Sequence, residues 1–183
     1  MAKIETRIQP AGNIRSFNES REIQGTALVF NQQTLISDLF YETILPEAVN
    51  NILNQDVRCL FNSDPSLIMG RTKSRTLVLK KTATGLEYHV ILPKSNAGNS
   101  LLENIKLGNI TSSAARYIVS QDKWTKLPNG KSLRTVTKIK QLFSVGPSTW
   151  ETDQSNTVGI SKSMSNLISR ARQLKILALK LKL

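Results

Sequence analysis

The chain of 183 residues contains a single cysteine and a single histidine. One cysteine cannot form an intramolecular disulfide, which fits a reducing cytoplasm. One histidine without paired cysteines excludes a zinc site, and we expect no metal. No run of eighteen apolar residues occurs, so no membrane span or membrane partner is expected. The N-terminal residues Met1–Glu5 lack the apolar stretch of a signal peptide.

Acidic residues are also scarce, with 13 Asp and Glu against 25 Lys and Arg and a net charge of +12. No acidic residue follows Asp153, whereas six basic residues do. Such charge favours contact with nucleic acid or an acidic surface. However, no RNP-like, helix-turn-helix or zinc motif is present, and the aromatic residues form no cluster with basic ones. No glycine-rich phosphate loop occurs either, so we expect neither a nucleotide nor any other cofactor.

Hydrophobic periodicity predicts mostly strands, with a few short helices. The strands are expected at 23–31, 57–62, 112–119 and 132–145, with a hairpin of 76–80 and 86–92 around Thr84-Gly85. A helix is expected at 99–107, ended by Gly108, and a short one opens at Pro46. The fold class is therefore α+β, a mostly antiparallel β-barrel with a few helices, in one domain over residues 1–151.

Residues 152–165 are rich in Ser, Thr and Asn and are predicted to form a linker. Beyond them, residues 166–183 have apolar side chains at spacings of three and four, which predicts an amphipathic helix with a basic opposite face. The apolar stripe is expected to bind the barrel or a partner, and membrane-surface or DNA contact stays open. The candidate partner-binding residues are Leu167, Ala171, Leu174, Leu177 and Leu181, and the basic ones are Arg170, Arg172, Lys175, Lys180 and Lys182.

Five ordered segments between about residues 20 and 158 resemble one known family. The segments are Ile23–Asn31, Asp56–Pro65 with Gly70-Arg71-Thr72, Gly85–Tyr88 with Leu92-Pro93, Gly98–Ile105 and Gly108-Asn109-Ile110. Together they are similar to the prohead proteases of tailed bacteriophages, whose fold is like that of the herpesvirus assemblins. The resemblance implies a serine endopeptidase that acts in capsid maturation.

The catalytic residues of that family are replaced in this chain. The family has His after Phe-Asn, Ser six residues after the turn glycine, and an acid before Val-Ser. The matching positions hold Ser63, Ala114 and Ser144. A serine hydroxyl needs a base to take its proton and an acid to orient that base. This chain is therefore expected to have no catalytic residue at the family positions, and so to be a pseudoenzyme.

Other residues are candidates to replace the triad. Ser112 and Ser113 adjoin Ala114, and Ser112 shares its face on a strand. His89 is interpreted as a packed or rim residue, and Cys59 as a small buried hydrophobe. A Ser-Lys dyad stays open because lysines are many. Arg116 is expected to face the former site.

We therefore expect a non-catalytic phage head protein that acts in capsid assembly or as a minor virion component. Its expected partners are the major capsid protein, the scaffold, or both, with the portal and packaged DNA as further options, and it is expected to be oligomeric or capsid-bound. It would act in the host cytoplasm during assembly and reside in the procapsid or virion head. Two alternatives stay open: an active prohead serine protease with displaced catalytic residues, and a basic DNA-contacting protein inside the head.

Overall fold

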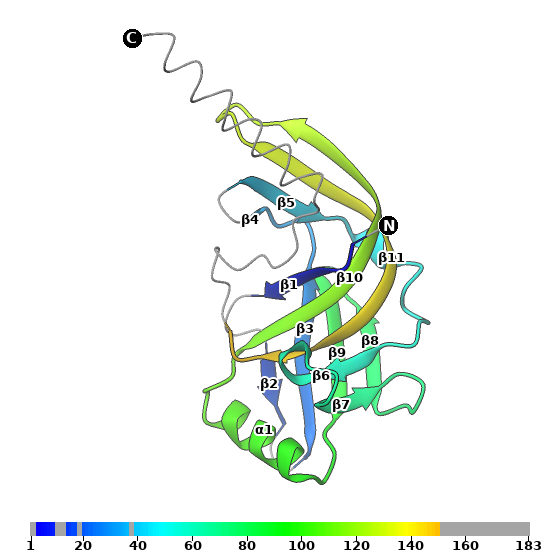
Figure 1. The fold of residues 1–183 in the computed structure, drawn as a ribbon, viewed down its shortest axis with the longest axis vertical. Helices are drawn as coiled ribbons and strands as arrows, with labels where there is room; N and C mark the ends of the chain where they lie inside the picture. Colours follow the sequence, from blue (N-terminus) through cyan, green and yellow to red (C-terminus); the bar gives the residue numbers. More distant parts are fainter. Residues whose placement is uncertain (1–2, 10–13, 18–19, 37–38, 151–183) are drawn as a thin grey trace.

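A computed structural model describes residues 3–9, 14–17, 20–36 and 39–150 (Figure 1). Its strands form two sheets. The larger has seven strands in the order β1-β10-β11-β5-β4, with β6 paired to β11 and β7 paired to β6. These strands are β1 (Glu5–Gln9), β4 (Thr34–Ile36), β5 (Phe40–Ile44), β6 (Arg58–Leu60), β7 (Ile68–Arg71), β10 (Ser112–Lys126) and β11 (Ser132–Ser148).

The smaller sheet has four strands in the order β2-β3-β9-β8. Their bounds are β2 (Ile14–Ser16), β3 (Glu22–Val29), β8 (Leu77–Lys81) and β9 (Gly85–Ile91). Strand β3 contacts β1, β10 and β11, so the two sheets pack face to face. The core between them is apolar, and its largest fully buried side chains include Tyr88, Tyr117 and Leu28.

The two sheets replace the closed barrel that the sequence predicted. Among the described strands, the larger sheet ends in β1 and β4 and the smaller in β2 and β8. Two β11 pairings are also parallel, with β5 and with β6, while β10 is antiparallel to it. The core is thus closed by packing of apolar side chains across two open sheets, not by hydrogen bonds around a ring. The excess of strands and the small number of helices are confirmed for the described residues.

Several local predictions are confirmed. The hairpin of β8 and β9 forms as expected, and residues Pro46–Val49 form a 3-10 helix, η1. Helix α1 spans Asn96–Lys106 and begins earlier than residue 99, because the Ser95 hydroxyl accepts a hydrogen bond from the Gly98 N–H. Gly108 follows the helix with φ +75°, the left-handed conformation that glycine adopts without strain.

Two predicted strands have different lengths. The segment expected at 57–62 ends as a strand at Leu60, because a short 3-10 turn, η2 (Phe61–Ser63), contains Asn62 and Ser63 at positive φ. The strand expected at 112–119 runs on to Lys126, since its partner β11 continues beside it to a turn at Gly130. We call this hairpin, residues 119–141, the arm; it lies at the top of Figure 1, and its β11 strand also pairs with β5 over residues 132–136.

The predicted linker at 152–165 and the predicted helix at 166–183 lie outside the described residues. In the part of the chain that the structure describes, no helix is long and apolar enough to cross a membrane.

Candidate functional site: the expected triad positions

Ala114 and Ser144 lie on neighbouring antiparallel strands. Ala114 of β10 is paired with Gly146 of β11, and Arg116 is paired with Ser144. Because side chains two residues apart share a face of a strand, Ala114 and Ser144 are diagonal neighbours on one face of the sheet. The register therefore places Arg116 beside Ser144, as the sequence predicted.

Ser63 reaches the same region from a third segment. Strand β6 pairs in parallel with β11, with Arg58 opposite Ser144, and leads directly into η2. The η2 turn contacts both β10 and β11. The Asn62 side chain fastens it there, because its Oδ1 accepts hydrogen bonds from the N–H and the hydroxyl of Thr149 at 2.8 and 3.1 Å. The three positions thus lie on segments that pack together.

The backbone of Leu60 closely approaches Gly146 in this region. A Cβ built on Gly146 would lie 2.2 Å from the carbonyl oxygen of Leu60, closer than any real contact, and its φ of +152° also disfavours a side chain. The resembled family prefers Val-Ser where this chain has Val145-Gly146. Ala114 and Ser144 are correspondingly only 5% and 3% exposed. Leu60 therefore occupies space that a side chain at position 146 needs.

The two fallback serines differ in their surroundings. Ser113 is fully buried, and its Oγ lies 2.8 Å from the Tyr88 Oη in a hydrogen bond across the core. Ser112 is 1% exposed, and its hydroxyl has no hydrogen-bond partner among the described residues. Neither hydroxyl is therefore bonded to a lysine, a histidine or a carboxylate of the described chain. Neither has the activating base that a nucleophilic serine needs.

His89 and Cys59 also lack the geometry for catalysis at this site. Tyr88 points into the core toward Ser113, so its strand neighbour His89 points to the opposite face of the smaller sheet. There the His89 Nδ1 lies 3.4 Å from a Glu22 carboxylate oxygen. Cys59 is fully buried, and burial raises the pKa of its thiol well above the usual range, so the thiol stays protonated.

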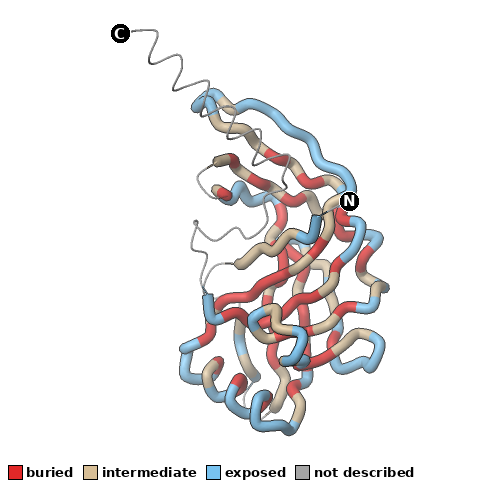
Figure 2. Tube along the Cα trace, viewed as in Figure 1, coloured by how far each residue is buried: buried red, intermediate tan, exposed pale blue. Residues whose placement is uncertain are grey.

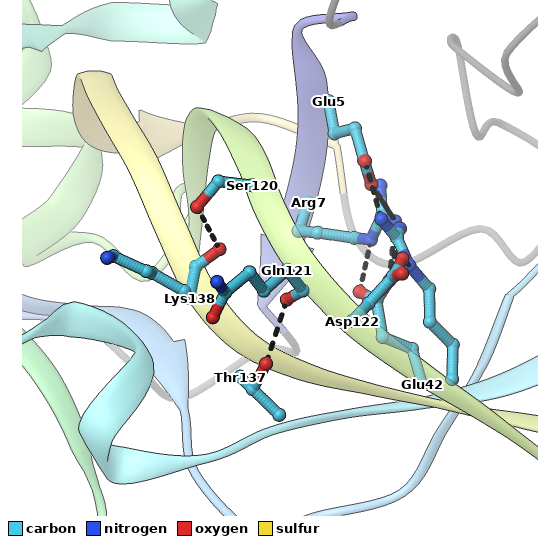
Figure 3. Close-up of polar contacts among 9 residues, drawn as sticks. Glu5, Arg7, Glu42, Ser120, Gln121, Asp122, Thr137 and Lys138 are labelled. Atoms are coloured by element: carbon cyan, nitrogen blue, oxygen red, sulfur yellow. Dashed lines mark hydrogen bonds and ion pairs between the residues drawn. The ribbon is translucent and has the colours of Figure 1, made fainter.

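A buried ion cluster, which the sequence analysis missed, lies where the arm joins the larger sheet (Figure 3). Arg7 donates to both carboxylate oxygens of Glu42 at 2.6 and 2.8 Å and to Glu5 at 2.7 Å. Arg134 donates to Glu5 at 2.6 and 2.9 Å, to Glu42 at 3.0 Å and to Asp122 at 2.6 Å. These contacts tie β1, β5, β10 and β11 together.

The ion cluster favours the charged forms of Glu5 and Arg7 despite their burial. Desolvation opposes ionisation of Glu5, but hydrogen bonds and charges from Arg134 and Arg7 outweigh it and lower the Glu5 pKa. Desolvation likewise opposes the charge on Arg7, and the surrounding anionic groups still raise the Arg7 pKa. The nearby Tyr117 hydroxyl is buried without a hydrogen-bond partner among the described residues, and burial raises its pKa. The cluster is a structural joint, since every carboxylate in it is paired with an arginine.

A surface pocket of about 370 Å³ lies elsewhere. It is lined by Leu53, Asn54, Gln55, Asp56, Thr72 and Lys73, and none of the former triad positions borders it.

Comparison with known proteins agrees with the resemblance seen in the sequence. The model of the Caudovirus prohead serine protease family matches residues 10–169. Among solved structures, the capsid assembly protease gp21 of bacteriophage T4 is similar, with 16% identity, a TM-score of 0.42, and coverage of 79% of this chain and 94% of that chain. No curated protein matches the chain. Since the family model spans most of the sequence, the chain belongs to the prohead serine protease family of the tailed bacteriophages.

Proposed function

We propose that this protein is a non-catalytic member of its family that acts in assembly of the phage head. The observation that carries the proposal is the chemistry at the three former triad positions. Ser63, Ala114 and Ser144 offer no base, no nucleophile and no orienting acid. Loss of triad members lowers the turnover of a serine protease by about a million-fold, leaving about a thousand-fold or more over water from binding and oxyanion stabilisation.

The surroundings of the site support the same proposal. A productive site needs an open approach for the substrate backbone and a rigid shell around the reacting groups. Here the carbonyl of Leu60 closes on Gly146, and both Ala114 and Ser144 are buried. A single recent loss of the nucleophile would leave the base and the acid in place. Replacement at three positions together with a changed shell indicates a protein kept for its binding surfaces.

The partner in this proposal is the major capsid protein, the scaffold, or both. A maturation protease must recognise segments of these proteins in order to cut them, and recognition does not depend on the triad. We place part of this recognition in the C-terminal residues Leu167, Ala171, Leu174, Leu177 and Leu181, whose spacing in the sequence predicts one apolar face. In this proposal the protein resides in the procapsid or in the virion head.

One observation favours the alternative of an active protease with a displaced nucleophile. The Ser112 hydroxyl is buried, has no hydrogen-bond partner among the described residues, and lies two residues before Ala114 on the same strand face. Such a hydroxyl has no competing hydrogen bond, although at 1% exposure the strand would have to move before a substrate could reach it. Against it stands the absence of any base bonded to it within the described chain, so the non-catalytic proposal is the stronger.

The test is co-expression of the protein with its cognate capsid protein and scaffold. Intact-mass spectrometry of all chains reports cleavage, and quantitative mass spectrometry of purified heads reports copy number. We expect no cleavage beyond that of a culture lacking the protein, together with a reproducible number of copies per head. Fragments that disappear in Ser112→Ala but persist in an exposed control, Ser74→Ala, would establish the displaced protease instead.

A further inference from the structure

The arm carries a concentration of positive charge that the proposed function does not use. Between residues 119 and 141 the one acidic residue is Asp122, and it is bonded to Arg134. Five lysines remain, and none forms an ion pair within the described part of the chain. They are Lys123, Lys126, Lys131, Lys138 and Lys140.

The arm presents this charge to solvent. Residues 120–126 are exposed in an unbroken run along β10, as the pale blue stretch at the top of Figure 2 shows. Lys138 and Lys140 on β11 are exposed too. In Figure 3 the Lys138 side chain points away from the ion cluster. The exposed run of β10 carries Lys123 and Lys126, which are three residues apart and therefore about 10 Å apart along a strand that rises about 3.4 Å per residue.

The arm is also held in a defined direction. Arg134 bonds Asp122 across the two arm strands, and it also bonds Glu5 on β1 and Glu42 on β5. Farther along, Ser120 donates to the Lys138 carbonyl at 3.2 Å and Thr137 donates to the Gln121 carbonyl at 3.1 Å (Figure 3). These bonds lie where register shifts interrupt the ladder, and such bulges increase the twist of a ribbon. The arm is therefore a twisted, braced ribbon.

Its composition fits a phosphate backbone better than a protein surface. Lysine is depleted in the cores of protein interfaces, which need apolar anchors. By contrast, phosphate contacts come from Lys together with Ser, Thr, Asn and Gln side chains, which are the residues that accompany the lysines here. Because β5 pairs with residues 132–136 of β11, the arm cannot enter a groove as an isolated ribbon, and its lysines would contact the phosphates from outside the groove.

Aromatic rings lie beside this charge. Trp124 is 40% exposed and packs edge-on against Phe40, with ring centroids 4.9 Å apart. The Lys131 ammonium lies 5.5 Å from the centre of the Tyr41 ring. The basic and aromatic side chains that are separate in the sequence are thus brought together at the arm, because β5 pairs with β11 in parallel from Phe40 onward.

We propose that the arm is a sequence-independent binding surface for duplex DNA, with its lysines on the phosphates. This inference is independent of whether the protein cleaves capsid components. Phosphate contacts release counterions, so the binding constant falls with salt by a slope of about 0.9 per contact. Each arm lysine on a phosphate therefore contributes measurably to the salt dependence.

The test uses the full-length protein and a fluorescent duplex of about two helical turns, with anisotropy measured over a series of salt concentrations. The arm variant is Lys123→Gln/Lys126→Gln/Lys138→Gln. The matched control is Lys73→Gln/Lys80→Gln/Lys94→Gln, which removes the same charge from exposed body positions. We expect the arm variant to lose at least tenfold in affinity at low salt and about 2 to 3 in salt slope, with the control within twofold of the wild type.

Two results would overturn the proposal. Equal losses in both variants would mean that binding follows net charge and not the arm. An arm variant that keeps its duplex affinity but loses binding to a polyglutamate peptide would assign the arm to an acidic protein segment. Because all six substituted side chains are exposed, unchanged circular dichroism and thermal unfolding are expected for both variants.

Discussion

The phenolic oxygen of Tyr88 on β9 lies 2.8 Å from the hydroxyl oxygen of Ser113 on β10, and this hydrogen bond joins the two sheets across the core. Both side chains are fully buried. A buried hydroxyl that loses its partner costs about 1–3 kcal/mol of stability, whereas removal of both partners is close to neutral. The pair therefore makes Ser113 a structural residue.

The first prediction contrasts the two adjacent serines. Ser113→Ala should lower the free energy of unfolding by about 1–3 kcal/mol, because it leaves the buried Tyr88 hydroxyl without its hydrogen-bond partner. Ser112→Ala should cause no loss, because the Ser112 hydroxyl has no hydrogen-bond partner among the described residues. Urea unfolding measures both, and the double variant Tyr88→Phe/Ser113→Ala should recover part of the loss. Equal effects of the two single variants would contradict this assignment.

The second prediction concerns the ion cluster. Glu42→Gln removes the charge that both Arg7 and Arg134 face, and breaking a buried ion network from one side costs about 3–5 kcal/mol. The control is Asp56→Asn, which breaks an exposed pair with Arg71 and should change the stability little, because solvent screens that pair. Thermal unfolding of the two variants separates the effects. A Glu42 variant as stable as the control would show that the cluster does not hold the arm to the body.

The third prediction follows from the lowered pKa of Glu5. A carboxyl whose pKa is lower in the folded protein contributes stability that is fully present above its unfolded value of about 4.5 and is lost as the pH falls through the folded value. Acid should therefore weaken the attachment of β1 below about pH 4.5. Unfolding measured from pH 7 to 3 should show a shallower acid loss in Glu5→Gln than in the wild type. An unchanged slope would contradict the role of Glu5.

The sequence predicted the elements whose signals are local. The hairpin at Gly85, the helix ended by Gly108 and the strand beginning near Ile23 all follow from periodicity and turn residues close in the chain. Strands β1 and β5 were missed because they are five residues long and gain their stability from partners far along the chain. Strand β8 is equally short, but the Thr84-Gly85 turn between it and β9 identified it as half of a hairpin.

The candidate site likewise has a part that the sequence predicted and a part that it did not. Aligned motifs predicted that Ser63, Ala114 and Ser144 lie near one another; Ala114 and Ser144 are on adjacent strands, and Ser63 is in the η2 turn, which contacts both strands. The ion cluster had no comparable signal, since Glu5 and Arg134 are separated by 129 positions and Arg7 and Glu42 by 35. The close approach of Leu60 to Gly146 depends on the packing of three strands, and no pattern in the sequence indicates that packing.

The fourth prediction tests the C-terminal residues. Leu174→Asp/Leu177→Asp should abolish incorporation into heads while leaving the two sheets folded, because charge on the predicted apolar face prevents its burial against a partner. The matched control, Lys175→Gln/Lys182→Gln, should weaken only salt-sensitive contacts. Quantitative mass spectrometry of purified heads measures incorporation. Normal incorporation of the aspartate variant, or of a chain truncated after Ser161, would place recognition entirely in the sheets.

The last prediction concerns restoration of the triad. Ser63→His/Ala114→Ser/Ser144→Glu rebuilds the three family residues, yet we expect no cleavage of the cognate scaffold above the wild type. Ser144 is 3% exposed, so the new carboxylate enters a site that has no room prepared for it, and Arg116 and Arg58, which lie opposite position 144, would compete with the new histidine for it. Catalytic groups also need positions held to about half an ångström by their supporting shell.

A paired variant isolates the contribution of that shell. Adding Gly146→Ser to the restored triad supplies the family residue, but its Cβ would meet the Leu60 carbonyl oxygen at 2.2 Å, so the β6–η2 segment must shift. We expect this fourfold variant to be less stable than the triple variant by thermal unfolding. The new Cβ clashes with backbone, which moves less easily than a flexible side chain. Scaffold cleavage by the triple variant at even a hundredth of an active protease's rate would show that the shell is intact and that the three substitutions alone silence the enzyme.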